Sequence, residues 1–271
     1  MLLRYAAVLA CVCPGISLLA ADEKASGPPP EVVELFDAAE SGKIQVTLIA
    51  RSSKHASVQL HNPTAAPLVV CTPSVILAQP RAFFAGPDRF REDADEKKKR
   101  EPQMMGLPFP QGPFNQQRQP PFDIFNRQNQ GNQFPGGQFD GPNGFFSVPA
   151  GKTVRLKLTG VCLQYGRREP NTRVVYDIAR FESQIDKPEL RALLEGLGRE
   201  KYGQTEAQIA AWHWTEGMTW RELASVNIRY MNGQERKRFT RAQIDRARRI
   251  AERLEAKVKE RSNSAATLAK K

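Results

Sequence analysis

The sequence predicts an α+β protein in which a small antiparallel β-sandwich, interrupted by a long disordered insertion, is followed by a helical module. Apolar residues alternate with period two at 44–77 and again at 148–176, and helix-start patterns follow from residue 186 onward. Short strands with turn signals and no helices between them favour a sandwich over a parallel sheet. We therefore expect six segments: a signal peptide (1–21), the first part of the β-domain with a short N-terminal helix (22–83), the insertion (84–146), the second part of the β-domain (147–180), the helical module (181–261) and a disordered tail (262–271).

The first residues have the features of a cleavable secretory signal peptide. Arg4 supplies a positive start, residues 5–20 are largely apolar, and the small Ala20 and Ala21 precede two acidic residues. We expect cleavage after Ala20 or Ala21 and export to the periplasm, the extracellular space or the cell envelope. No later run is apolar enough to span a bilayer, so the mature chain is expected to have no membrane span. An uncleaved anchor is the alternative, because the residue three positions before the cut is a leucine.

The β-domain is expected to start behind a short helix. Three prolines lead into a run from Glu31 to Phe36, and Ser41-Gly42 follows, which predicts a helix with a glycine stop. Beyond it, runs with alternating or clustered Val, Ile and Leu predict strands at 44–48, 58–60, 68–70, 75–77, 154–158 and 174–176.

The insertion is marked by its composition. Between residues 101 and 146 the chain has 9 Gln, 5 Asn, 7 Gly, 8 Pro and 8 Phe, and no helical or strand period survives. Such a segment is expected to bury too little apolar surface to offset the entropy of the chain. It is either a tolerated loop expansion or a sticky segment that contacts partners, as Gln/Asn tracts spaced by aromatics do.

The helical module shows repeated start signals. Pro188 opens a run whose leucines share one face up to Gly198. Three capping-box patterns follow, formed by the pairs Thr205 and Gln208, Thr219 and Glu222, and Thr240 and Gln243.

The last helix is strongly basic. From 234 to 261 there are 11 Lys and Arg against 5 Asp and Glu, a difference of 11 − 5 = +6 in a chain with net charge +11. This helix is either an electrostatic surface for anionic partners or a solvated face with pairs such as Glu255 and Lys259 at i, i+4 spacing. The solvated face is the favoured interpretation and leaves the partner unknown. Under the alternative, the candidates are an anionic envelope polymer or another surface protein, and export makes nucleic acid the less favoured partner.

The cysteines suggest one covalent link. Cys11 and Cys13 lie in the signal peptide, which leaves Cys71 and Cys162 in the mature chain. In an oxidising compartment two such cysteines on neighbouring strands most often pair. A disulfide would close the two halves of the β-domain across the insertion, worth about 4 kcal/mol in the chain-entropy model.

A competing interpretation concerns the stretch Val161-Cys162-Leu163 and the later run from Ala207 to Trp212. These resemble the paired motifs of bacterial surface thioester domains, in which a Cys is crosslinked to a Gln on an apolar, Trp-terminated helix. The resemblance implies that Cys162 is the thiol, Gln208 the acyl partner, and His213 a group that assists by proton transfer. Otherwise Gln208 is a helix-cap residue, and Trp212, Trp214 and Trp220 form a small aromatic core.

Other chemistries have no motif to support them. The three histidines are far apart, two cysteines make no zinc site, and neither a phosphate loop nor a serine-nucleophile elbow is present. The segment from Cys162 to Pro170 and the Trp-rich helix are similar to uncharacterised secreted bacterial proteins, which names no activity. We therefore expect a non-enzymatic structural or interaction protein without cofactor or metal. The alternatives are a thioester module, and an anionic polymer or nucleic-acid binder that uses the basic helix.

Overall fold

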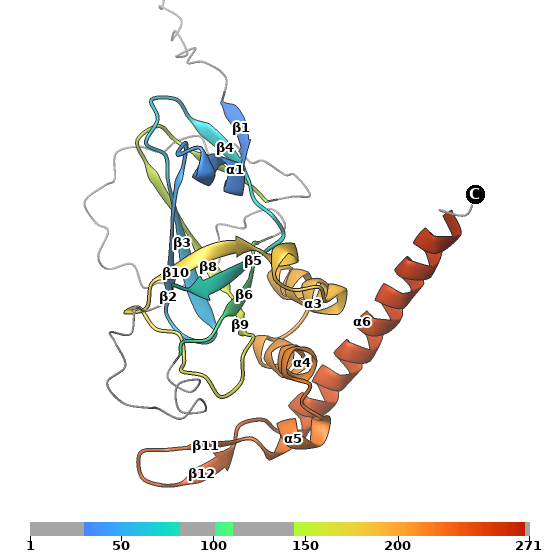
Figure 1. The fold of residues 1–271 in the computed structure, drawn as a ribbon. Coiled ribbons are helices and arrows are strands. Elements are labelled where there is room, and N and C mark those ends of the chain that lie inside the picture. The colour runs from blue at the N-terminus through green and yellow to red at the C-terminus, as the bar shows by residue number, and fades with distance from the viewer. Residues whose placement is uncertain (1–29, 82–100, 111–143, 269–271) are drawn as a thin grey trace, which may run out of the picture.

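The computed structural model describes residues 30–81, 101–110 and 144–268. The chain is α+β, with mostly antiparallel sheets followed by helices, as predicted (Figure 1). The signal peptide and its cleavage at Ala20 or Ala21 lie outside the described residues.

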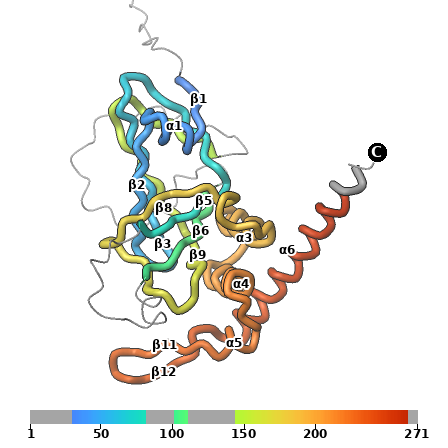
Figure 2. The backbone as a smooth tube through the Cα atoms, viewed as in Figure 1, coloured from blue at the N-terminus to red at the C-terminus, as the bar shows by residue number. Residues whose placement is uncertain are grey.

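The larger sheet has seven strands in the order β8-β3-β2-β10-β5-β6-β9. Its strands are β2 (Gln45–Ala50), β3 (His55–His61), β5 (Val75–Pro80), β6 (Met105–Pro108), β8 (Thr153–Thr159), β9 (Val161–Cys162) and β10 (Tyr176–Arg180). The two edge strands β8 and β9 are joined by Gly160 alone, so the sheet nearly closes on itself; Figure 2 traces this path. A Cβ atom at Gly160 would lie 2.4 Å from Leu107 Cδ2 and 2.7 Å from the Gly106 carbonyl oxygen, which explains the glycine at this tight passage.

A smaller sheet of three strands has the order β1-β4-β7, with β1 (Glu31–Glu34) parallel to β4 (Leu68–Cys71) and β7 (Phe145–Val148) antiparallel to it. The N-terminal helix is therefore shorter than predicted: α1 covers only Leu35–Glu40, and the Glu34 carboxylate caps it by accepting from the backbone N–H groups of Phe36 and Asp37. The predicted glycine stop is confirmed, since Gly42 has φ +73°.

The prediction of disorder for the insertion (84–146) is wrong in the two parts of it that the structure describes, 101–110 and 144–146. Residues 101–110 contain β6, and Met105, Leu107 and Phe109 there are fully buried. Phe145 and Phe146 begin β7. The apolar side chains of these short runs find partners in distant strands, which composition within a local window does not reveal. The rest of the insertion lies outside the described residues.

The helical module follows a single turn of 3-10 helix at Phe181–Ser183. It contains α3 (Pro188–Gly198), α4 (Gln204–Glu216), α5 (Trp220–Ser225), the hairpin strands β11 (Asn227–Arg229) and β12 (Glu235–Lys237), and α6 (Arg241–Leu268). The start of α3 and the capping boxes at Thr219 and Thr240 are confirmed. The box at Thr205 is wrong, because α4 begins at Gln204 and has no side-chain cap. The predicted disordered tail is wrong for 262–268, where α6 continues.

Three apolar clusters hold the molecule together. The first lies inside the β-domain and joins residues of both sheets, among them Leu60, Leu68 and Val148. The second joins Leu77 and Val161 of the larger sheet to the buried leucines of α3, so the helices dock on the β9 side of this sheet. The third joins Trp212 of α4, Leu223, Phe239 and the start of α6.

The C-terminal half of α6 extends away from the rest of the described chain (Figure 1). No helix within the described ranges is both long and apolar enough to cross a membrane.

Candidate functional site

The structure brings Cys162 and Gln208 into direct contact across 46 residues of chain. The Gln208 side-chain oxygen Oε1 accepts from the Cys162 backbone N–H at 2.8 Å, and Gln208 Nε2 donates to the Cys162 carbonyl oxygen at 2.7 Å. Both residues are buried. Their meeting was expected from the sequence, but the contact runs through the backbone of Cys162.

The geometry of the edge strand explains this pairing. On one side, β9 pairs with β6, and the Leu163 N–H donates to the Met104 carbonyl. In an antiparallel strand, adjacent residues point their N–H and C=O groups in opposite directions, so those of Cys162 face the open edge of the sheet. There the Gln208 amide takes the place of a neighbouring strand and satisfies two buried backbone groups that would otherwise have no partner.

The Cys162 thiol points elsewhere. Its Sγ atom lies 3.7 Å from the carbonyl oxygen of Ser53, on the loop between β2 and β3. Burial raises the pKa of this thiol to about 12; the nearby Glu169 carboxylate adds to the rise and Arg238 opposes it. The thiol is therefore neutral near pH 7. Burial also raises the pKa of Tyr176, whose buried hydroxyl has no hydrogen-bond partner among the residues that the structure describes.

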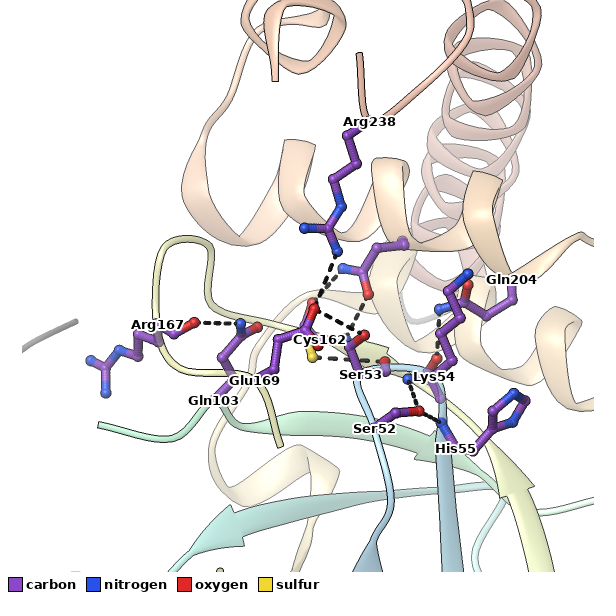
Figure 3. A network of polar contacts seen from close by, with 12 residues as sticks. Ser52, Ser53, Lys54, His55, Gln103, Cys162, Arg167, Glu169, Gln204 and Arg238 are labelled. Carbon is purple, nitrogen blue, oxygen red and sulfur yellow. Dashed lines mark hydrogen bonds and ion pairs between the residues drawn. The ribbon is translucent and has the colours of Figure 1, made fainter. Parts of the chain in front are cut away.

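Glu169 and Arg238 lie next to the thiol (Figure 3). The Ser53 hydroxyl donates to Glu169 Oε1 at 3.5 Å, and Arg238 Nη2 lies 3.8 Å from the same oxygen. The Arg238 guanidinium also lies 4.9 Å from the ring centre of Trp212, one helical turn after Gln208 on α4. Arg238 thus connects the end of the β11–β12 hairpin to the surroundings of Cys162.

His213 faces away from this pair. Its Nδ1 atom is 2.7 Å from the Met218 carbonyl oxygen, and its ring stacks on Trp220 at 4.1 Å. Both contacts hold the imidazole toward α5, so the structure does not bring His213 together with Cys162.

The tryptophans do not form one aromatic core. Trp212 is buried and contacts Tyr165 and Phe239 edge-on. Trp214 instead packs against the second apolar cluster, and its Nε1 donates to Glu255 at 2.9 Å.

The predicted partner Cys71 lies in the other sheet. Both Cys71 and Cys162 are free thiols, and Cys71 sits on β4 between Glu34 of β1 and Phe145 of β7. Burial and the neighbouring Glu34 raise the pKa of Cys71. The disulfide expected from the sequence is therefore not formed in this structure.

Sequence reasoning did not single out Ser53, Glu169, Tyr176 or Arg238. None belongs to a local motif, and each reaches the site from a different segment. The hairpin that positions Arg238 does carry a signal, since Asn232-Gly233 is a common turn between paired strands and Gly233 has φ +78°.

Neither metal-ligand clusters nor the groove between α4 and α5 adds a further candidate site within the described residues. In residues 30–81, 101–110 and 144–268, no group of three or more His, Cys, Asp or Glu side chains is placed to hold a metal ion. An open groove lies between α4 and α5, but its two carboxylates already have structural partners: Glu216 accepts from the Tyr165 N–H and Glu222 caps α5.

The chain matches no protein-family model, no curated protein and no solved structure.

Proposed function

We propose that this protein is a non-enzymatic interaction protein of the cell envelope that binds an anionic partner through α6. The β-domain, in this proposal a small sandwich whose two sheets share one core, serves as the scaffold. Support for the sandwich comes from the first apolar cluster, which contains side chains from both sheets. The helices docked on this scaffold hold the start of α6 in place.

The observation that carries the proposal is a row of like charges on α6. Arg249, Arg253 and Lys257 are exposed, form no ion pair within the described residues, and follow one another at i, i+4 spacing. Like charges at this spacing destabilise a helix by about 0.2–0.5 kcal/mol per pair. A helix with only a structural role gains nothing from this arrangement, whereas a polyanion would neutralise all three charges from one side.

Export is part of the proposal, supported by the signal-like N-terminus. N-terminal sequencing of the protein isolated from its own cell envelope should start at Ala21 or Asp22. A chain that begins at Met1 and is found in the cytoplasmic fraction would contradict export.

Binding to a defined polyanion, dextran sulfate, tests the proposal. The triple variant Arg249→Glu, Arg253→Glu and Lys257→Glu should bind much more weakly, and its affinity should fall less steeply with salt because fewer counterions are released. The matched control reverses three exposed charges on the β-domain, Lys152, Arg155 and Lys157, and should bind as the parent protein does. Equal losses in both variants, or no salt-dependent binding of the parent, would overturn the role of α6.

A thioester module is the second candidate, favoured by the contact between Cys162 and Gln208. In the reaction, Sγ attacks the Gln208 amide carbon Cδ, the Cδ–Nε2 bond breaks, and Nε2 leaves as ammonia with the thiol proton. Burial of both residues would protect the product from water. This candidate ranks second because the amide is engaged by the Cys162 backbone and the raised pKa of the thiol keeps it neutral.

The intact mass of the protein under non-reducing conditions decides this second candidate. A thioester lowers the mass by about 17 Da through the lost ammonia, and the variant Gln208→Ala removes that difference. A disulfide lowers the mass by about 2 Da. The unmodified mass of the reduced chain rules out both links.

A further inference from the structure

The β11–β12 hairpin projects from the helical module and buries none of its own strand side chains. All six residues of the two strands are exposed. Only the base is fixed, where the Arg238 N–H donates to the Val226 carbonyl oxygen at 2.8 Å and the flanking Val226 and Phe239 are buried. An isolated two-stranded hairpin is marginally stable in water, so this one gains from a partner that covers it.

The hairpin also exposes apolar side chains. Ile228, Tyr230 and Met231 are exposed by 39%, 48% and 108%, and they are three of the six large hydrophobic residues exposed in the described chain. Ile228 pairs directly with Arg236 across the hairpin, and the Arg236 guanidinium lies 5.9 Å from the ring centre of Tyr230. Because side chains alternate along a strand, these apolar and cationic groups share one face and Met231 stands at the turn.

We propose that the hairpin inserts Met231 and the ring of Tyr230 into the interfacial layer of an anionic lipid surface. Arg236, on the same face, would then meet the phosphate groups, while Arg229 and Lys237 on the opposite face add positive charge near the surface, with Glu235 the single acid on the strands. This inference rests on the proposed function, whose anionic partner it identifies as a lipid surface.

A lipid surface fits these residues better than a soluble polyanion does. A polyanion is matched by charge alone and leaves the three apolar side chains in water. Tyrosine and arginine both combine an apolar body with a polar end, which suits the boundary between headgroups and acyl chains. Each Lys or Arg near such a surface adds electrostatic attraction.

Co-sedimentation of the purified full-length protein with vesicles tests the inference. Vesicles of phosphatidylglycerol mixed with phosphatidylcholine should bind the protein, whereas pure phosphatidylcholine should bind it far less. The variant Ile228→Ser, Tyr230→Ser and Met231→Ser should lose at least about tenfold in vesicle affinity, because the removed groups bury apolar surface only on binding. Its binding to dextran sulfate should stay unchanged.

The matched control removes exposed apolar side chains elsewhere, through Val32→Ser and Val175→Ser, which should leave vesicle binding intact. Undiminished vesicle binding by the hairpin variant overturns the inference, and so does equal binding to both kinds of vesicle. If the parent binds dextran sulfate but no vesicles, the lipid inference fails while the proposed function stands. If charge reversal on α6 leaves dextran sulfate binding unchanged, the proposed function fails instead.

Discussion

The side-chain amide of Gln208 hydrogen-bonds to both backbone groups of Cys162, at 2.8 and 2.7 Å, and so closes the open edge of the larger sheet. This pair is the polar link between β9 and α4, alongside the apolar contacts of the second cluster. The Gln208 side chain is therefore one of the links between the two parts of the molecule, and it occupies the position where chemistry at Cys162 would take place.

Replacing Gln208 by Leu should lower the free energy of unfolding by about 2–4 kcal/mol, because two buried backbone groups lose their partners. Urea unfolding followed by circular dichroism measures the change. The control Gln204→Leu, on the same helix, removes a single part-buried hydrogen bond, from Gln204 Nε2 to the Gly160 carbonyl oxygen, and should cost much less. Equal costs would contradict the special role of Gln208.

The stability contributed by Cys162 should fall in alkali. Its thiol has a pKa of about 12 in the folded state against 9.0 for an unperturbed cysteine. Because the folded state holds this proton more tightly, the contribution is complete below pH 9 and is lost as the pH rises toward 12, by about 1.4 kcal/mol per pH unit. The variant Cys162→Ala should lose less stability than the parent between pH 8 and pH 10.5. Parallel losses would show that the thiol does not titrate as the structure implies.

Arg238 should restrict access to the thiol. In the native parent, iodoacetamide should modify Cys71 before Cys162, because Cys71 is partly exposed while Cys162 is 1% exposed. The variant Arg238→Ala loses the contact with Trp212 and the ion pair with Glu169, and should accelerate modification of Cys162, as read by peptide mass spectrometry. Arg229→Ala, on the exposed part of the hairpin, is the control. An unchanged rate in Arg238→Ala would exclude a covering role.

Two of the three predicted capping patterns, at Thr219 and Thr205, should respond differently to mutation. Thr219→Ala should cost about 1 kcal/mol, since Thr219 Oγ1 accepts from the Glu222 N–H at the start of α5. Thr205→Ala should cost little, because Thr205 caps no helix. Thermal unfolding of both variants measures the difference, and a larger loss for Thr205→Ala would contradict the observed start of α4.

Gly160→Ala should be severely destabilising, by about 3 kcal/mol or more, because the added Cβ would overlap the Gly106 carbonyl, which cannot move without breaking the β6–β9 pairing. Gly217→Ala is the comparison: it has φ +67° and open space around it, so only backbone strain of about 1 kcal/mol is expected. A mild effect at Gly160 would mean that the junction of β8 and β9 can widen.

The sequence by itself determined the elements whose signals are local. Alternation predicted β2, β3 and β8, and the leucine spacing predicted α3, because the period of a strand or helix follows from backbone geometry. Capping boxes at Thr219 and Thr240 were readable for the same reason. Predictions from local patterns were wrong where contacts with distant segments determined the structure. Residues Glu31–Glu34 form a strand because they pair with β4. Strand β6 forms within a Gln- and Pro-rich stretch because other strands bury its side chains.

Only the tertiary structure decided what the candidate residues do. The motif resemblance named Cys162 and Gln208, but folding fixed which atoms meet. The Gln208 amide bonds the backbone of Cys162 at the open edge of β9, and the Cys162 thiol lies against the Ser53 carbonyl oxygen. Cys71 and Cys162 ended in different sheets because strand order follows pairing over the whole domain, which spacing along the chain does not encode. Glu169 and Arg238 joined the site for the same physical reason, since contacts between distant segments depend on how complete elements pack.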